Sequence, residues 1–412
     1  MLLVTTAPLL AACGAGWQAD PDLLAPPRRV AAALGDPLRP GEDQIDPTGI
    51  PVLEPPTHVR PCCQLGMDQR VKLGGAEVPG YRRPNVTGVD ELGNHSYDSG
   101  LVPLTADEHG VDVEKNGIVF TCRGGFIDTA HIRDYADWTF YAGLRVARSL
   151  PEGTTIEVPG DGAKRRVVVR PIPAEIVAER GRFAVAAPLA QWIAQRLALW
   201  HEIASWYGVE SVKGFSEKGS AFSPEDLYSN ILGMKIGAAL VEGPIPRTLE
   251  EYNVAMDAWI AAVLHRLDVL PVAEARIAMK SVDGLWWDSR KILPDPTMVL
   301  RRHVDTGSRQ APWRLEDAMP PGEIPEQLRE QCEDVPPLLT LSVPETIGSL
   351  RIADVVTVEI EPEGWAEREG FPFPRPGVRR LTSADFPAVV EAMRDDMRRV
   401  LGEGFDRPGK TD

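Results

Sequence analysis

Positive charge is scarce in this chain of 412 residues. Lys and Arg number 44 against 60 Asp and Glu, which gives a net charge of −16. An acidic surface repels phosphate backbones, and no basic cluster alternates with aromatic residues, so we expect no nucleic-acid partner. The hydrophobic content of 43% and the charged content of 25% are ordinary for globular proteins, which excludes wholesale disorder and a protein with many membrane spans.

The common catalytic and nucleotide-binding signatures are also missing. The sequence has no GxSxG elbow, Walker loop, dinucleotide-binding glycine fingerprint or EF-hand loop, and no CxxC pair for a zinc ribbon. These absences exclude the commonest serine hydrolases, nucleotide-binding proteins and calcium-binding proteins. Glycine and proline are abundant, at 37 and 38 residues, and predict long ordered loops.

The first twelve residues, MLLVTTAPLLAA, form a short apolar run that ends at Cys13. The run is far below the roughly 20 residues of a membrane-spanning helix, and the tetrapeptide LAAC resembles the lipobox of bacterial lipoproteins. This resemblance implies a signal peptide over residues 1–12 and a Cys13 thiol that carries acyl chains such as palmitate. Two acyl chains hold a protein stably at a membrane. A signal peptide normally begins with basic residues, whereas the first one here is Arg28, so we expect the true start codon to lie upstream.

Gly14 stands where many lipoproteins of the inner membrane of enteric bacteria carry aspartate. We therefore expect a cell-envelope protein that is anchored in the outer membrane and faces the periplasm. The alternative is that the first residues form a buried strand or helix with a packed cysteine. The sequence does not identify protein partners, which stay unknown.

Four further cysteines are present, Cys62, Cys63, Cys122 and Cys332. An exported protein can form disulfides, and adjacent Cys62 and Cys63 can scarcely bond to each other without strain. We expect one bridge from this pair to Cys122 or Cys332. Cys122 is also a candidate nucleophile, because it ends a predicted strand just before a helix N-terminus, where a thiol pKa is lowered and backbone N–H groups can hold an oxyanion.

Residues 13–60 are rich in proline and acids, and we interpret them as a lipidated tether and a proline-rich arm. Residues 61–405 are predicted to form one domain of the α+β class, with a helical core, peripheral β-hairpins and long proline-rich loops. Apolar spacing, capping residues and turn formers define its elements. Helices are predicted at 131–150, 188–207, 223–241, 248–268 and 383–401, and strands at 117–122, on both sides of a turn at 160–162, at 297–303 and at 355–360.

His131 stands beside carboxyl residues at the start of a predicted helix. His131 and Asp134 are three residues apart and share a helix face, and Asp128 is expected to cap the same helix. A carboxylate beside an imidazole can orient it, raise its basicity or share a divalent metal with it. The alternative is an ordinary capped helix start.

His201 and Glu202 lie in an otherwise apolar predicted helix. The zinc-protease motif HExxH also begins with this pair, but its second histidine is replaced here by Ser205, a poor zinc ligand, so a standard zinc protease is not supported. Burying either residue unpaired would cost several kcal/mol, so both should face a polar cavity, a partner or water. His131 and Asp226 are candidates to complete a metal site with His201. A purely structural hydrogen-bonded network is the alternative.

Four segments together resemble an uncharacterised bacterial lipoprotein family, domain of unknown function 4056. They are Pro61-Cys62-Cys63, residues 121–134 (TCRGGFIDTAHIRD), residues 201–208 (HEIASWYG) and residues 222–230 (FSPEDLYSN). The resemblance implies no activity, so the functional hypotheses rest on the chemistry of the residues.

The first hypothesis is a hydrolase that acts on an envelope substrate such as a peptide, glycan or lipid ester. His131, Asp134, His201 and Asp226 would hold a divalent metal such as zinc or orient a nucleophile, and Glu202 would act as general base. The alternative is a non-catalytic envelope lipoprotein with a structural or ligand-binding role. Shared ligation requires His131 and His201 within about 5 Å of each other beside an open cavity, whereas a structural network is closed and fully hydrogen-bonded.

Overall fold

The computed structural model describes most of the chain. The described residues are 25, 27–35, 49–60, 63–70, 72–73, 76–77, 83–99, 114–210, 217–243, 245–291, 297–375 and 377–403. The predicted signal peptide, Cys13 and Cys62 lie outside these residues, so what the sequence suggests for them stays a prediction.

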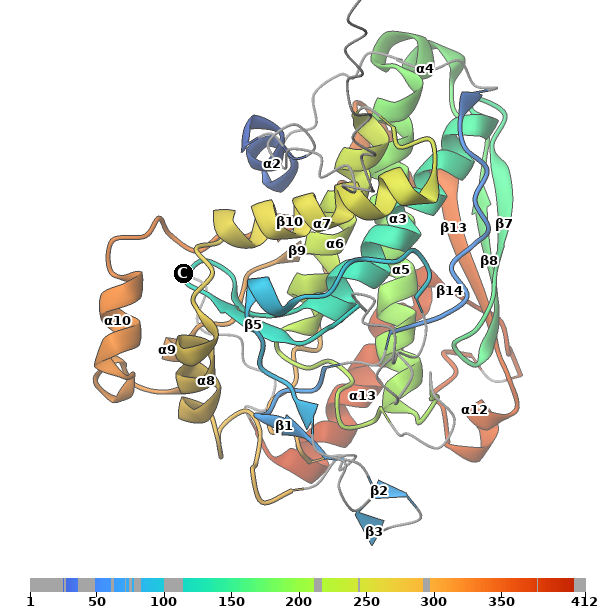
Figure 1. Cartoon of the computed structure of the whole chain (residues 1–412). Coiled ribbons are helices and arrows are strands. Elements are labelled where there is room, and N and C mark those ends of the chain that lie inside the picture. The colour runs from blue at the N-terminus through green and yellow to red at the C-terminus, as the bar shows by residue number, and fades with distance from the viewer. Residues whose placement is uncertain are drawn as a thin grey trace, which may run out of the picture.

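Helices form the centre of the molecule (Figure 1). α3 (Thr129–Ser149), α5 (Arg182–Trp206) and α6 (Asp226–Glu242) pack against one another, and nearly every residue in them is buried. α5 and α6 are apolar on all sides, which suits helices that have no face toward solvent. α7 (Leu249–Arg266) begins after Thr248, whose side chain accepts a hydrogen bond from the backbone N–H of Glu251, and it contacts α6.

Two glycines allow α3 and α6 to touch through their backbones. A Cβ atom on Gly233 of α6 would lie 2.2 Å from the carbonyl oxygen of Ile132, and one on Gly237 would lie 2.6 Å from that of Ala136. No side chain other than hydrogen fits at either position. This contact sets the distance between the first turns of the two helices.

The largest sheet lies beside the helices. It has four antiparallel strands in the order β14 (Leu381–Thr382), β13 (Val356–Pro362), β8 (Ala163–Val169) and β7 (Thr154–Val158), and β13 contacts α5. β7 and β8 form the predicted hairpin. Its turn contains Gly160, Asp161 and Gly162, all with positive φ, a conformation that glycine and aspartate tolerate better than most residues.

A second hairpin leads directly into α3. β5 (Ile118–Thr121) pairs with β6 (Gly125–Asp128), and the last residue of β6 is the N-cap of α3. The hairpin packs in a separate apolar cluster that includes Phe120, Phe126 and Trp286.

The remaining elements are shorter, apart from the last helix. They are α2 (Pro27–Leu34), α4 (Ala174–Arg180), α8 (Val272–Ser281), α9 (Leu315–Ala318), α10 (Glu326–Cys332), α11 (Ile352–Val355), α12 (Trp365–Arg368), α13 (Phe386–Leu401), β1 (Asp68–Gln69), β2 (Lys72–Leu73), β3 (Ala76–Glu77), β4 (Arg83–Pro84), β9 (Arg309–Gln310), β10 (Leu341–Ser342), β11 (Thr346–Ile347) and β12 (Leu350–Arg351). No helix among the described residues combines the length and the apolar character needed to cross a membrane.

The proline-rich arm is partly docked on the helices. α2 packs on α6 and α7, and Nη2 of Arg29 donates to the carbonyl oxygen of Ala239 at 2.5 Å. The same guanidinium lies over the ring of Trp259, 5.5 Å from its centroid. This part of residues 13–60 is therefore an ordered arm.

The predicted α+β class is confirmed, with corrections to single elements. α5 begins at Arg182 rather than at Pro188, which lies inside the helix. α6 begins at Asp226 rather than at Ser223. The strand predicted at 297–303 is wrong: this segment consists of turns and bends, and the N–H of His303 donates to the carbonyl of Phe222 at 2.8 Å in a loop instead of joining a sheet.

The cysteine predictions also need correction. Cys122 forms a disulfide with Cys332, which ties the β5–β6 hairpin to α10 across a sequence separation of 210 residues. The predicted bridge from Cys62 or Cys63 to one of these residues is therefore wrong. Because its sulfur is bonded, Cys122 is not the nucleophile that its sequence position suggested. Cys63 is a buried thiol.

We predict that Gly233→Ala destabilises the protein by about 3 kcal/mol or more, because the added methyl group would overlap the backbone of α3 and force the helices apart. Urea unfolding measures the change. Gly322→Ala is the matched control, since a Cβ there meets no atom within 4 Å, and it should alter stability by less than about 0.5 kcal/mol. Equal stability of the two variants would contradict the backbone contact.

Candidate metal centre

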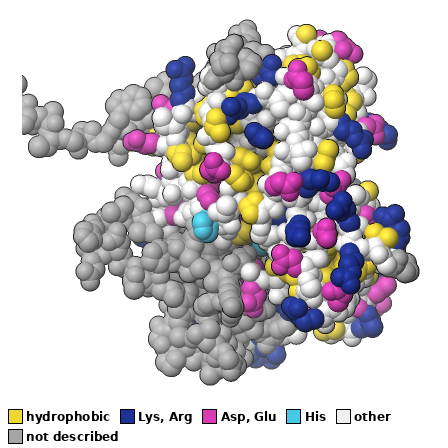
Figure 2. Space-filling model, turned by 90° about the vertical axis from the view of Figure 1, so that its right-hand side faces the viewer, with side chains coloured by type: hydrophobic (Ala, Val, Ile, Leu, Met, Phe, Trp, Pro, Cys, Tyr) yellow, Lys and Arg dark blue, Asp and Glu magenta, His cyan; other side chains and the backbone are white. Residues whose placement is uncertain are grey.

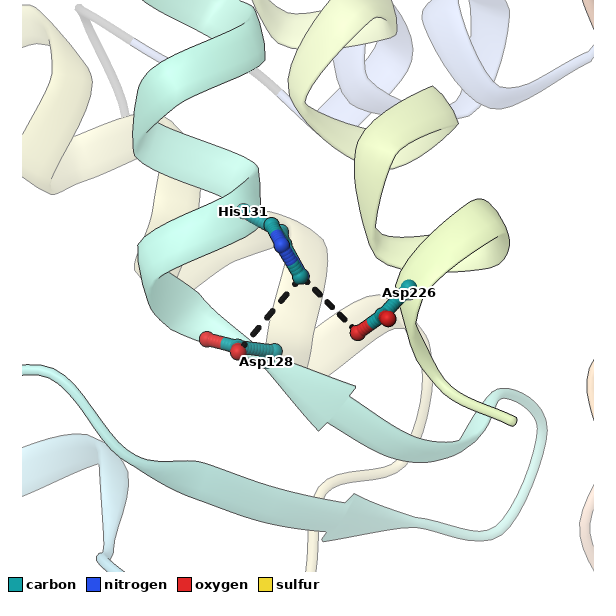
Figure 3. Close-up of side chains that lie close together, drawn as sticks. All are labelled: Asp128, His131 and Asp226. Atoms are coloured by element: carbon teal, nitrogen blue, oxygen red, sulfur yellow. Dashed lines mark ion pairs between the residues drawn. The ribbon is translucent and has the colours of Figure 1, made fainter. Parts of the chain in front are cut away.

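Asp128, His131 and Asp226 converge where the first turns of α3 and α6 meet (Figure 3). Nδ1 of His131 lies 3.1 Å from Oδ1 of Asp226 and 3.5 Å from Oδ2 of Asp128. One potential ligand atom from each residue lies within 4.8 Å of the other two, and all three residues are buried. The group could hold a metal ion.

The local structure fixes Asp128 in place. Its Oδ1 accepts a hydrogen bond from the backbone N–H of Ala130 at 2.7 Å, as the predicted N-cap should. Oδ2 accepts one from the backbone N–H of Cys63 at 2.9 Å, and the Cys63 thiol also hydrogen-bonds this carboxyl group. The backbone N–H of Asp128 donates to Oγ of Ser229 on α6 at 3.0 Å. The carboxylate therefore cannot rotate away from His131.

The two carboxylate oxygens of Asp226 have different neighbours. Its Oδ2 accepts a hydrogen bond from the backbone N–H of Ser223 at 2.8 Å. Its Oδ1 is buried and lies 3.1 Å from Nδ1 of His131, which hydrogen-bonds this carboxyl group. Burial and the nearby charge of Glu202 raise the pKa of Asp226 to about 7, although His131 favours the ionised form.

Two further carboxyl groups add negative charge around this group. Oε2 of Glu202 accepts from the backbone N–H of Phe222 at 2.7 Å, and Oε2 of Glu225 accepts from the hydroxyl of Ser223 at 2.6 Å. The Oε1 atoms of both glutamates are buried without a hydrogen-bond partner within the described part of the chain. Burial, followed by the charge of Asp226, raises the pKa of Glu225 well above its usual value.

Carboxyl groups outnumber imidazoles at the centre. The buried carboxyl group of Asp226 interacts electrostatically with those of Asp128, Glu202 and Glu225, and burial raises the pKa of Asp128, Glu225 and Asp226. Burying ionised carboxylates is costly unless protons or cations neutralise them. A divalent cation would supply that neutralisation.

Asp134, which the sequence suggested as a ligand, belongs to another cluster. Its Oδ1 accepts from Nη1 of Arg60 at 2.7 Å, and the same guanidinium contacts Glu114 at 2.6 Å and Asp137 at 3.0 Å. All four side chains are buried. Asp134 shares a helix face with His131 as predicted, but its carboxylate is already used to hold the segment before Cys63 against α3.

His201 is likewise not a ligand with His131. Its Nδ1 lies 3.1 Å from Oδ1 of Asp161 in the β7–β8 turn. Burial alone would lower the pKa of His201, but the charge and hydrogen bond of Asp161 raise it to about 9. A protonated imidazole has no lone pair for a metal. The two histidines therefore have separate carboxylate partners, and the shared site predicted from the sequence is not formed.

The sequence predicted correctly that His131 and Asp226 are neighbours. It did not predict the contacts that Asp128 and Asp161 make with histidines. Asp128 was expected only to cap a helix, and Asp161 was only a turn residue. Asp128 and His131 are three residues apart, and this spacing could have indicated that Asp128 lies beside His131. No local sequence pattern predicts the contact of Asp161 with His201.

Comparison with known proteins gives a family but no activity. The model of the family described as "Protein of unknown function (DUF4056)" matches residues 50–316, which is more than half of the chain and includes all three residues of the group. No curated protein and no solved structure matches the chain significantly.

We predict a pH-dependent contribution of His201 to stability. Because its folded-state pKa of about 9 exceeds the unfolded value of about 6.5, the protonated histidine stabilises the fold fully below pH 6.5, and this contribution is lost as the pH rises from 6.5 through 9. The shift corresponds to roughly 3 kcal/mol. Urea unfolding between pH 6 and pH 9.5 should therefore show a larger decline for the wild type than for His201→Gln, which keeps only the decline near pH 7 that carboxyl groups with raised pKa values such as Asp226 cause. The stability of the control His265→Gln, at an exposed position of α7, should decline with pH as that of the wild type does. A decline of the same size in the stability of His201→Gln would refute the ion pair.

Proposed function

This chain belongs to the DUF4056 family, and from its site we propose that it is a divalent-metal-binding lipoprotein of the cell envelope whose metal centre serves hydrolysis. Asp128, His131 and Asp226 are the proposed ligands. The observation that carries the proposal is the convergence of one potential ligand atom from each of these buried residues within 4.8 Å of the other two.

The chemistry of the ligands limits the choice of ion. One imidazole and two carboxylates suit zinc and also harder ions such as manganese or ferrous iron, whereas an ion such as copper(I) prefers sulfur ligands. Three protein ligands leave coordination positions open, as in catalytic zinc sites. We propose zinc as the first ion to test.

Glu202 is the proposed general base. A bound divalent ion would act as a Lewis acid and make water a better nucleophile. Glu202 approaches Asp226 closely enough to raise its pKa, and its Oε1 is left without a hydrogen-bond partner in the described chain. That oxygen is available to accept a proton from water.

The burial of the centre favours a second candidate function, a structural ion. Asp128 and Asp226 are fully buried and His131 is 2% exposed. Structural metal sites are typically closed to solvent, whereas catalytic sites keep a position open to substrate. Metal binding is common to both functions, and only hydrolysis separates them.

We predict that the purified full-length protein, prepared without chelators, contains about one zinc or other divalent ion per chain. His131→Ala and Asp226→Asn should lose the ion because each removes a ligand. His201→Ala, which removes an equally buried histidine outside the centre, is the matched control and should keep it. The measurements are elemental analysis and thermal unfolding with and without added zinc or manganese.

Glu202→Gln distinguishes the two functions, because it keeps the ligands and removes the base. It should retain the ion and lose hydrolysis of chromogenic ester, peptide and glycoside substrates. A metal-loaded wild type that hydrolyses none of them supports the structural ion. A wild type that neither contains nor is stabilised by a divalent ion would refute the metal centre itself.

The anchor is proposed from the sequence, because Cys13 and the residues before it form a lipobox-like end. In a bacterial host, the wild type should sediment with membranes and enter the detergent phase, whereas Cys13→Ser should remain in the aqueous phase because it has no thiol to acylate. Cys63→Ser is the control for the loss of a thiol elsewhere. Equal partition of wild type and Cys13→Ser would exclude acylation at this position.

A further inference from the structure

A groove of about 610 Å³ lies between the β5–β6 hairpin, α9, α10 and residues 335–338. α9 and α10 are at the far side of the molecule from the four-stranded sheet (Figure 1). None of the three proposed metal ligands lines the groove, so what it binds is independent of the metal centre. Its volume falls within the roughly 300–1,000 Å³ of ligand-binding clefts.

Both walls of the groove are fixed to the same hairpin. The disulfide between Cys122, directly after β5, and Cys332 ties α10 to one side of it. On the other side, Nε of Arg123 donates to the carbonyl oxygen of Pro337 at 3.2 Å, and the backbone N–H of Leu339 donates to the carbonyl oxygen of Arg123 at 3.0 Å. Walls that are already in place lower the entropic cost of binding a ligand.

The groove has an apolar wall that a ligand can reach. Residues 335–338, with the sequence VPPL, line it and are half-buried or exposed. The apolar lining continues inward to buried side chains, those of Phe120, Ile324 and Leu328. Because proline has no backbone N–H, a ligand cannot receive ladder hydrogen bonds from the two prolines of this wall. A ligand is therefore recognised here through its side chains and not as an added β-strand.

Exposed carboxylates line the α10 side of the groove. Glu326, Glu330 and Glu333 follow one another at i, i+4 and i+7, so they share one face of α10 and its end, and they span about 10 Å along the helix. None of them forms an ion pair with a residue that the structure describes. Like charges four residues apart destabilise a helix, and a bound cation would relieve their repulsion.

Positive charge in the groove does not balance these carboxylates. Two arginines line it, and Arg314 is already paired with Asp317 at 3.2 Å. Arg329 is left against four glutamates, the fourth being Glu316 of α9. The side of the molecule that carries β7 and β8 differs, because basic and acidic side chains are interspersed over it (Figure 2). The groove therefore combines an apolar wall with an acidic rim.

We propose that this groove binds a short cationic segment of a partner protein, with apolar side chains on residues 335–338 and Lys or Arg side chains at the glutamates of α10. Carboxylates spread over about 10 Å match several separated positive charges, whereas a single amine would meet only one of them. The apolar wall favours a peptide over a polyamine, because a polyamine carries spaced charges but no apolar side chains.

The test uses the full-length protein and the fluorescence anisotropy of labelled hexapeptides at low ionic strength. The probes are the cationic peptide KLFKLK, its acidic counterpart ELFELE and its uncharged counterpart SLFSLS, with spermidine as a competitor. KLFKLK should bind with micromolar affinity, and added salt should weaken it. The double variant Glu326→Lys with Glu330→Lys should weaken binding at least tenfold, because it replaces two attractive charges by repulsive ones.

A matched variant separates local recognition from the net charge of the protein. Glu175→Lys with Glu179→Lys makes the same change at the same spacing on α4, which is also exposed and does not line the groove, and it should bind as the wild type does. Val335→Asn tests the apolar wall and should weaken KLFKLK at least threefold. Asp226→Asn should lose metal and keep the peptide, so failure of one proposal does not decide the other.

The proposal is overturned if KLFKLK does not bind, if ELFELE or SLFSLS binds as tightly, or if the α4 and α10 double variants weaken binding equally, since binding would then follow net charge alone. Spermidine that binds as tightly as KLFKLK would assign the groove to a polyamine instead. Binding of KLFKLK that is lost in the α10 variant, kept in the α4 variant and weakened by Val335→Asn supports it.

Discussion

The backbone contact between α3 and α6 is the constraint on which the candidate site depends. Gly233 and Gly237 leave no side chain between the helices, so the carbonyl oxygens of Ile132 and Ala136 lie against the backbone of α6. Helices usually pack with axes about 8–10 Å apart, set by the side chains between them, and glycines permit the close end of this range. His131 in the first turn of α3 and Asp226 at the first residue of α6 come within 3.1 Å for this reason.

Buried charged side chains have different sets of partners at three places in this molecule. Around Arg60 the carboxylates of Glu114, Asp134 and Asp137 contact its guanidinium, and Arg133 and His95 also contact Glu114 and Asp137, so basic and acidic side chains are similar in number. At the β7–β8 turn Asp161 lies between two cationic side chains. At the α3–α6 contact the one histidine that meets Asp128 and Asp226 is His131, and burial raises the pKa of Asp128, Glu225 and Asp226, so a bound cation there would take the place of protons.

The proposed metal centre and the β7–β8 turn are separate but share a neighbour. The buried phenol of Tyr135 on α3 has its pKa raised well above the usual value, first by burial and then by the charge of Glu202, and the charges of His131 and Asp161 also act on it. α3 thus carries His131 at the metal centre and, one turn further along, a tyrosine that lies near the charges of both places. The β7–β8 turn and the start of α6 are placed by the same helical core.

The sequence by itself determined the local features of this protein. Apolar spacing located the core helices, Asp128 was recognisable as a cap, and Gly160-Asp161-Gly162 located a hairpin turn, because each of these signals acts over a few neighbouring residues. Only the tertiary structure decided which partners meet. The disulfide joins residues 210 positions apart, and His201 selects Asp161 instead of His131. Residue spacing predicts which face of a helix a side chain occupies. What that face contacts depends on tertiary packing, here on the glycine contact between α3 and α6 and on the packing of the hairpin turn against α5.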